Sequence, residues 1–430
     1  MSSLVHRISS FWSCVNSTLF PALDAAEVEM TPKLYQFVAL LDFLQIEHFV
    51  PLPSRYQVGA KPHDRRCLAR AFVAKAFYNA PDTKSFRDRL LHDKDLRHVC
   101  GWASRGAVPS ESTFSRAFAW FADLGLTDGV LAAQVQVWLG ATLIRDVATD
   151  STAIEAREKP VTRAKPPADL AVAEAAPPMP EGLTPPPASS VPTGEPSTEP
   201  RQPATQHGPT ATPVLPGASP TAQTKRSKKV TKTVAKSKAL AHLYTPDEVS
   251  RLERQLDQVP EIALLELRTA CDVGCKTNSK GNKDYWIGYK FHVRVAEGNL
   301  PLVAVTTAAS VHDSQVTIPM MKLSDRLVTS LYELKDRAYD AYWIRTAAEV
   351  AGHVPIIDYV KRRGQEQARA LEPDRAEHYK GRTVAERFNA RLKDEFGGGR
   401  VRVRGNRKVH THLMFGLLLI FADQVLRVFQ

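Results

Sequence analysis

A long segment that cannot form a packed core divides this 430-residue chain into two parts. Residues 159–240 hold seventeen of the 30 prolines, and no aromatic residue occurs between Trp138 and Tyr244. Such a composition buries too little apolar surface to offset the entropy lost on ordering. We therefore predict a disordered, Pro/Ala/Thr-rich insertion over residues 159–240. It ends in a basic run, residues 225–238, which favours non-specific contact with nucleic-acid phosphates.

The composition favours a polyanionic partner and a reducing compartment. Lys and Arg outnumber Asp and Glu by 57 to 46, a basic excess that points first to nucleic acid. The five cysteines are sparse, and Cys271 and Cys275 lack the further ligands that a zinc site needs. No run of 18 or more apolar residues occurs, so the apolar stretch over 413–429 is predicted to be a core helix, with no membrane contact. We expect a cytoplasmic protein.

The first part of the chain is predicted to be helical. After an N-terminal extension, residues 1–29, apolar residues recur at three- and four-residue spacing through residues 30–138. Within this helical domain, Pro109 and Ser110 mark the start of a helix whose polar first turn fits a helix-turn-helix that reads DNA. An ordinary helical hairpin explains the same pattern equally well.

The second part, residues 139–158 and 241–430, alternates between strands and helices. A strand is expected over LGATLIRDVATD, and a Glu-Gly-Asn turn joins two strands at about 285–296 and 301–308. SLYELKD and VPIIDYV read as further strands, and residues 380–396 as a helix. This order predicts an α/β domain whose mixed sheet is flanked by helices.

Two of the expected strands end in an acid, Asp150 and Asp336. Reacting groups collect at the carboxyl ends of strands in α/β sheets, and two carboxylates there could share a hard divalent ion. Asp146, four residues before Asp150 and on the same strand face, is a rival ligand that lies further inside the strand. Asp313 and Asp340 are expected to lie at helix N-termini, Asp313 as an N-cap.

The helix predicted over residues 380–396 offers a third carboxylate. At about 100° per residue, four polar residues fall on one face: Tyr379, Arg382, Glu386 and Lys393. An apolar set on another face should pack on the sheet: Ala385, Phe388 and Leu392. The polar face then presents a carboxylate for metal beside cations and a phenol for DNA phosphates. Arg387 and Arg391 fall on a solvated side, from which they could also touch phosphates.

The spacing Tyr379-x2-Arg382-x3-Glu386-x6-Lys393 resembles the Y-R-E-K motif of bacterial insertion-sequence DDE transposases. Other stretches resemble segments of the same family: ATDST at Asp150, KDRAYDA at Asp336, GYKFH, PLVAVTTAASVHDS and LRHVCGWASRGAVPSESTFSRAF. The resemblance covers most of residues 30–155 and 244–430. Only 50 residues separate Asp336 from Glu386, so a β-rich insertion that some members carry there is absent.

The resemblance implies an RNase H-like catalytic core with a preceding all-α domain. Three acids would bind two Mg²⁺ or Mn²⁺ ions: Asp150, Asp336 and Glu386. Residues expected to bind DNA are Tyr379, Arg382, Lys393, Arg387, Arg391 and Lys290. The enzyme would cut DNA at the terminal inverted repeats of its element and join the freed ends to target DNA, as a dimer on DNA beside the bacterial nucleoid.

Two other functions are compatible with the same residues. An RNase H-like nuclease would cut DNA without joining it, but the Tyr-Arg-Lys set around Glu386 argues against this class. A catalytically inactive or repurposed transposase would bind DNA only, and the presence of all three acids argues against it.

Overall fold

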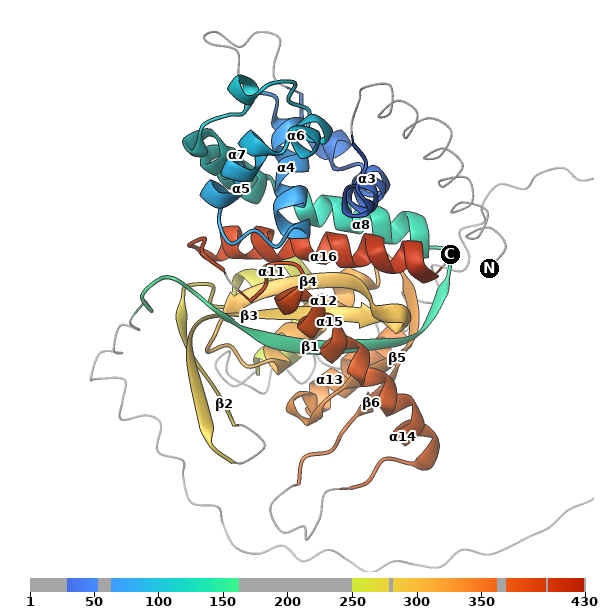
Figure 1. Cartoon of the computed structure of the whole chain (residues 1–430). Helices are drawn as coiled ribbons and strands as arrows, with labels where there is room; N and C mark the ends of the chain where they lie inside the picture. The colour runs from blue at the N-terminus through green and yellow to red at the C-terminus, as the bar shows by residue number, and fades with distance from the viewer. Residues whose placement is uncertain are drawn as a thin grey trace, which may run out of the picture. The chain divides into compact units, whose positions relative to one another are not determined.

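A computed structural model of the chain describes residues 29–52, 63–161, 250–277, 281–361, 369–399 and 401–428 (Figure 1). The predicted N-terminal extension and the predicted disordered insertion, with its basic run, lie almost wholly outside these residues.

The first described part is helical, as predicted. Its helices are α3 (Pro32–Leu44), α4 (Arg65–Phe77), α5 (Thr83–His92), α6 (Lys94–Val99), α7 (Glu111–Leu124) and α8 (Leu126–Leu139), with 3-10 turns η2 (Ile46–Phe49) and η3 (Arg105–Ala107). Local signals set the helix starts: the hydroxyl of Thr31 accepts a hydrogen bond from the Leu34 amide, and Pro32 occupies the first turn. In α7 the three phenylalanines are buried, whereas Ser112, Ser115 and Arg116 are exposed. A DNA-reading role for α7 stays a prediction.

The second part is built around one mixed sheet. Its strands are β1 (Leu143–Glu155), β2 (Asp272–Thr277), β3 (Lys283–Ala296), β4 (Leu300–Ala308), β5 (Thr329–Lys335) and β6 (Val354–Ile357). The order is β2-β3-β1-β5-β6, and β4 also pairs with β3. β3 is antiparallel to β1, β2 and β4, whereas β1, β5 and β6 are parallel to one another. The expected RNase H-like mixed sheet is therefore confirmed.

The β3–β4 hairpin is as predicted, but β1 is longer than predicted. A 3-10 turn, η5 (Glu297–Asn299), joins β3 to β4, and its Gly298 has φ 79°, which glycine adopts without strain. The prediction that the first strand ends at Asp150 is wrong. β1 continues to Glu155 because residues 150–155 keep pairing with β3 after the pairing with β5 has ended.

Helices cover both faces of the sheet. They are α10 (Arg251–Asp257), α11 (Pro260–Leu265), α12 (Ser314–Ser324), α13 (Tyr342–Ala351), α14 (Pro373–Tyr379), α15 (Thr383–Asp394) and α16 (Asn406–Val428), with 3-10 turns η6 (Arg337–Tyr339) and η7 (Lys380–Arg382). Adjacent residues of β3 face different layers: the ring of Phe291 lies 6.2 Å from that of His410 on α16, whereas Lys290 binds Asp313 at the start of α12. Helices α15 and α16 therefore cover one face, and α12 the other.

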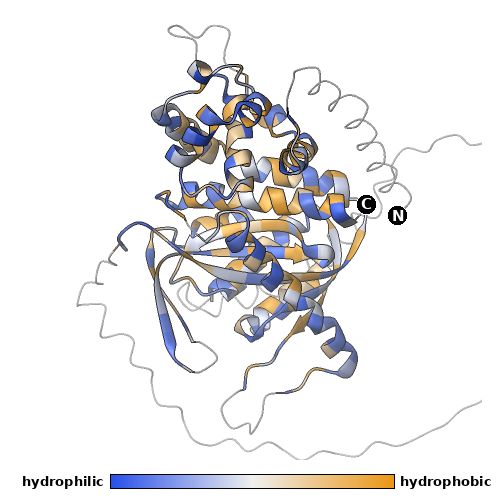
Figure 2. Ribbon diagram, viewed as in Figure 1, coloured by the Kyte–Doolittle hydropathy of each residue, from blue (hydrophilic) through white to orange (hydrophobic). Residues whose placement is uncertain are grey.

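Helix α16 lies between the N-terminal helices and the sheet (Figures 1 and 2). The Phe415 ring lies 5.8 Å from Phe72 of α4, and Phe421 lies 6.4 Å from Phe43 of α3. Within the described ranges α16 is the one helix long and apolar enough to cross a membrane, but 89% of its apolar window is buried in the protein. It thus packs as the predicted core helix, and the helical part and the sheet share a core through it.

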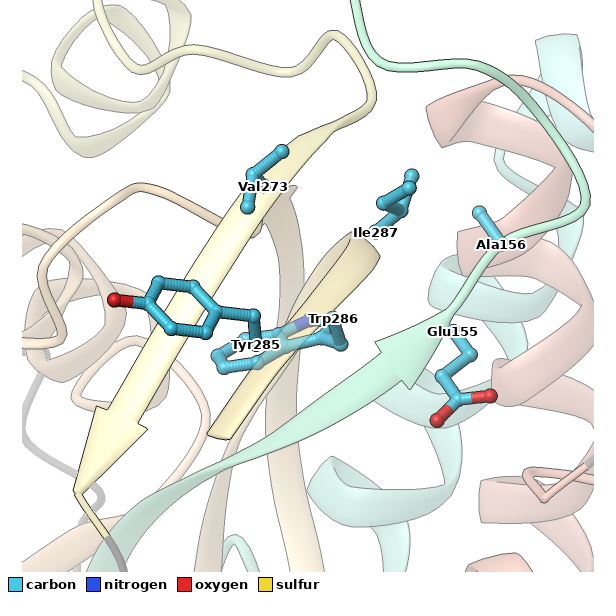
Figure 3. Close-up of a pocket in the computed structure, with 6 residues that line it drawn as sticks. All are labelled: Glu155, Ala156, Val273, Tyr285, Trp286 and Ile287. Carbon is cyan, nitrogen blue, oxygen red and sulfur yellow. The ribbon is translucent and has the colours of Figure 1, made fainter. Parts of the chain in front are cut away.

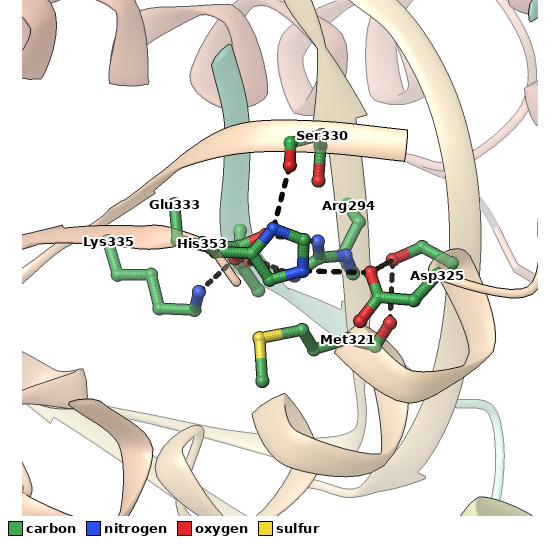
Figure 4. Close-up of polar contacts among 9 residues, drawn as sticks. Arg294, Met321, Asp325, Ser330, Glu333, Lys335 and His353 are labelled. Carbon is green, nitrogen blue, oxygen red and sulfur yellow. Dashed lines mark hydrogen bonds and ion pairs between the residues drawn. The ribbon is translucent and has the colours of Figure 1, made fainter. Parts of the chain in front are cut away.

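A buried ionic triad lies beneath the sheet on the α12 side (Figure 4). Two nitrogens of Arg294 donate to the two oxygens of Glu333, at 2.8 and 2.5 Å, and Lys335 also binds Glu333. All three side chains are fully buried. Burial would raise the pKa of Glu333, but the two cations outweigh it and lower that pKa.

We predict that Glu333→Gln lowers the free energy of unfolding by roughly 3–5 kcal/mol, because it leaves two buried cations without a counter-charge. Urea unfolding followed by circular dichroism measures the loss. The matched control is Glu377→Gln, whose pair with Lys380 is 73% exposed on both sides, and which should cost about 1 kcal/mol or less. Equal losses for the two variants would contradict a stabilising role for the triad.

Candidate active site

The pairing register of two central strands places Asp150 beside Asp336. β1 and β5 are parallel, and their last paired residues are Thr149 and Lys335. The next residue on each chain is an acid, so Asp150 and Asp336 are neighbours on adjacent strand positions, which lie about 4.8 Å apart. Asp336 then turns the chain, since its carboxylate accepts a hydrogen bond from the Ala338 amide at 2.9 Å. Asp150 differs from its prediction because it lies within its strand rather than at its end.

Helix α15 carries the third acid over this pair. Its apolar side, which includes Ala385, Phe388 and Leu392, is fully buried, as predicted. The side-chain amide nitrogen of Asn389 donates a hydrogen bond to the Asp150 carboxylate at 3.1 Å. Glu386 lies one turn earlier on the helix, with its side chain 52% exposed and one oxygen 2.6 Å from Arg382. The Asn389–Asp150 bond therefore fixes the part of α15 from which Glu386 projects.

The single helix predicted over residues 380–396 is in fact two pieces, η7 and α15, and α14 precedes them. Tyr379 ends α14, Arg382 ends the 3-10 turn η7, and Glu386 lies in the first turn of α15. The tighter 3-10 turn changes the angular positions calculated for one α-helix. Even so, Arg382 contacts two other residues of the motif. It binds Glu386, and its guanidinium carbon lies 5.7 Å from the centre of the Tyr379 ring.

Burial and neighbouring acids raise the pKa values of Asp150 and Asp336. Burial is the main cause that raises the pKa of Asp150 to about 6, and the charges of Asp336 and Asp313 add to it. Burial likewise raises the pKa of Asp336, with Asp313 adding to it, while the charge of Arg382 opposes both shifts. Burial, with a smaller contribution from neighbouring acids, therefore favours the protonated forms of Asp150 and Asp336 when no cation is bound.

Asp313 is a fourth acid near this corner, and the sequence interpretation missed its role. It occupies the N-cap position of α12, as predicted, but its side chain makes no capping hydrogen bond. Its carboxylate instead accepts a hydrogen bond from Lys290 at 3.0 Å and lies 3.8 Å from His292. The signal was the alternation in GYKFH, which puts Lys290 and His292 on one face of β3. Lys290 is 14% exposed and binds this acid, and its expected contact with DNA stays a prediction.

Three buried polar atoms next to the acids have no hydrogen-bond partner among the described residues. They are the Tyr339 hydroxyl, the side-chain oxygen of Asn389, and Nδ1 of His292, which lies 3.8 Å from Asp313. The charges of Asp150, Asp336 and Asp313 all act on Tyr339, so its hydroxyl lies close to them. Buried polar atoms of this kind are usually satisfied by water or an ion.

The residues present fit a hard divalent cation. Asp150 and Asp336 supply oxygen ligands, and their raised pKa values show that a positive charge would stabilise them. Across the described ranges, no group of three or more His, Cys, Asp or Glu side chains is already arranged to hold a metal. The carboxylate of Glu386, the predicted third ligand, binds Arg382 instead.

Two family models match the chain. One, described as Transposase DDE domain, matches residues 269–422, and the other, described as Transposase domain (DUF772), matches residues 25–130. The first includes Asp336 and Glu386, and the second spans α3 to α7. The chain belongs to the DDE transposases of insertion sequences. No curated protein and no solved structure matches it. Asp150 of this transposase lies outside both matched ranges, so its position rests on the β1–β5 register.

The rival acids of the transposase are engaged elsewhere. Asp146 pairs with Arg145 at 2.9 Å and with His378 at 3.1 Å, and its partner on β5 is Tyr332, four positions before Asp336. Asp340 was expected to cap or charge a helix start. It binds Arg345 and accepts a hydrogen bond from the Val360 amide instead.

The predicted DNA-contact residues on α15 differ in their exposure to solvent. Arg391 does not lie on a solvated side, so that prediction is wrong. Its side chain is 19% exposed and binds Glu395 and Asp423, and it therefore links α15 to α16. Arg387 is exposed as predicted. Lys393 is half-buried, and its pKa is lowered first by burial and then by the charge of Lys276 on β2.

We predict that folding stability without divalent metal falls as the pH rises through about 6. The folded pKa of Asp150 lies above its usual 3.8, so its contribution is full below that value and is lost as the folded carboxyl ionises. The free energy of unfolding should differ by roughly 3 kcal/mol between pH 4 and pH 7. Urea unfolding across this range should show the full decline in the wild type and in the exposed control Glu377→Gln, and a smaller one in Asp150→Asn, in which Asp336 still has a raised pKa. A decline of the same size in Asp150→Asn would contradict the assignment.

Proposed function

We propose that this transposase cuts DNA at the ends of its element and joins the freed ends to target DNA, with Asp150, Asp336 and Glu386 as its catalytic acids. The observation that carries the proposal is the β1–β5 register, which sets two carboxylates with raised pKa values side by side under the helix that bears Glu386. Two carboxylates at one corner of the sheet suit the chemistry of phosphodiesters, whose charge is handled through divalent cations.

The three acids would hold Mg²⁺ or Mn²⁺, in a two-ion arrangement. The ions would activate the attacking oxygen and stabilise the leaving oxygen. In the first step water attacks the phosphorus at the element's end, and the bond to the 3′ oxygen breaks. In the second step the freed 3′-hydroxyl attacks a target phosphodiester, and one phosphodiester replaces another without an outside energy source.

The remaining residues of the motif would position DNA. Arg382 binds Glu386 and interacts electrostatically with Asp150 and Asp336, so a phosphate that enters the site offers it an alternative partner. When Arg382 moves to that phosphate, Glu386 is free to join the other two acids. Tyr379 and Lys393 flank this position, and the exposed Arg387 could add a phosphate contact.

The partners of this reaction would be the element's terminal inverted repeats and target DNA. Joining two ends to one target calls for a dimer on DNA. The net charge of +11 suits both substrates, and the reaction would take place in the cytoplasm beside the nucleoid.

We predict that Glu386→Gln abolishes magnesium-dependent strand transfer, with at least a hundredfold loss, because it removes a metal ligand while it keeps the side chain's size. The assay uses purified protein, labelled DNA with the element's own ends and a supercoiled target, with magnesium or EDTA. Asp336→Ala should lose cleavage and keep binding of the ends. The control Glu377→Gln, an exposed acid on α14, should behave as the wild type.

Other outcomes of this assay point to the alternative functions. Cleavage without joined product would indicate a nuclease. Binding of the ends without cleavage, in magnesium and in manganese, would indicate an inactive descendant of a transposase.

A further inference from the structure

The end of β1 meets the segment that leads into α16. Glu155 and Ala156, where β1 ends its pairing with β3, border a hollow of about 540 Å³ (Figure 3). The next residue is Arg157, whose backbone carbonyl accepts a hydrogen bond from Nε of Arg404 at 3.0 Å. Two stretches that are 247 residues apart in the sequence therefore lie side by side at this end of the sheet (Figure 1).

These two stretches, residues 157–159 and 404–408, are strongly basic, and we call them the basic junction. They contain one acid, Glu158, and five exposed cations: Arg157, Lys159, Arg404, Arg407 and Lys408. Arg407 pairs with Asp123 of α7 at 3.5 Å. Within the part of the chain that the structure describes, the other four cations form no ion pair with an acid. The basic junction therefore presents a net positive charge to solvent.

Hydrogen bonds to the sheet hold the basic junction in place. One oxygen of the Glu158 carboxylate accepts hydrogen bonds from the Tyr289 hydroxyl at 2.5 Å and from the Gly405 amide at 3.1 Å. The side-chain amide of Asn406 donates to the Thr306 carbonyl of β4 at 2.9 Å. The one acid of the junction is thus bound by two donors of the protein, and the unpaired cations around it are left to bind an anion from solvent.

The strand β1 sets the distance between the basic junction and the catalytic acids. Asn389 of α15 binds Asp150, and Arg404, in the segment between α15 and α16, binds the backbone at Arg157. Seven residues separate these two points of the strand. At about 3.3 Å per residue they lie at most about 23 Å apart. A DNA strand advances about 3.4 Å per nucleotide along the helix axis, so this distance corresponds to about seven base pairs.

We propose that the basic junction binds the backbone of the DNA duplex at the element's end, with Arg157, Arg404 and Lys408 on phosphates about seven base pairs from the cleaved one. This inference rests on the proposed function, which brings that phosphate to Asp150. Contacts between cations and phosphates fix the position of a duplex without reading its sequence, so the junction would hold the end in register with the acids. A symmetric contact with a second copy of this chain would bring the same cations against one another, and the charge therefore favours DNA.

The test measures binding in EDTA, where no catalysis takes place. Duplexes of the element's end carry an uncharged methylphosphonate in place of one phosphate at a time, and fluorescence anisotropy gives the affinity of each. For the wild type we expect a loss of about fivefold at positions about five to nine base pairs from the cleavage site, because an exposed ion pair is lost. In the double variant Arg404→Ala/Lys408→Ala, unmodified DNA should bind more weakly. The same methylphosphonates should then have no further effect, because their partners are absent.

Single variants separate the charge of the junction from its structural contacts. Lys408→Ala should reduce the slope of log affinity against log salt by about 0.9, the value for one lost phosphate contact. Arg404→Lys keeps the charge and should keep the wild-type slope. The matched control is Arg326→Ala, at an exposed arginine that follows α12 and pairs with Glu261, and it should bind every duplex as the wild type does. Circular dichroism and a thermal melt confirm that each variant is folded.

The outcomes distinguish this inference from the proposed function. If no methylphosphonate in that window weakens binding, or if those losses persist unchanged in the double variant, the inference is overturned even when strand transfer succeeds. If the double variant binds DNA as the wild type does but dissociates a dimer in gel filtration, the junction is a protein interface and the inference fails. Losses that disappear in the double variant support the inference even if the wild type neither cuts nor joins DNA, in which case only the proposed catalysis fails.

Discussion

The long central strand β1 determines where the chemistry can take place. It is antiparallel to β3 along its second half and parallel to β5 along its first half. Because β5 stops after Lys335 while β1 continues, Asp150 lies at the point where one neighbour ends. A shift of one residue in the β1–β5 register would turn one of the two acids to the other face of the sheet. The pairing of the strands thus sets the positions of Asp150 and Asp336 without a contribution from any helix.

The two faces of this sheet have different chemistry. The face toward α15 and α16 is mostly apolar, and Asn389 supplies one polar contact, to Asp150. The opposite face buries Arg294, Glu333 and Lys335, and its border holds Asp313 with Lys290. Burial of so many charges costs solvation energy, which is offset only because each ion has a close counter-charge. Asp336 directly follows Lys335, so the ionic triad also anchors the strand that presents this acid.

In the mechanism that we propose, the contact between Arg382 and Glu386 would connect DNA binding to assembly of the site. With Glu386 bound to Arg382, Asp150 and Asp336 are the two proposed ligands left for a cation, and the charge of the same arginine acts on both of them. A phosphate that attracts Arg382 would release Glu386 at the moment when substrate arrives.

Local patterns in the sequence determined the helical first part, the β3–β4 hairpin and the buried side of α15, because helix and turn signals act over a few residues. Only the tertiary structure decided that β1 runs through Asp150, that Asn389 holds that acid, and that the side chain of Asp313 binds Lys290 rather than capping its helix. It also showed that Arg391 is bound by Asp423 of α16. These features depend on contacts between residues far apart in the chain, such as the β1–β5 pairing across almost two hundred residues. Periodicity within a segment does not encode which distant segment will pair with it, and the packed sheet and helices supply that choice.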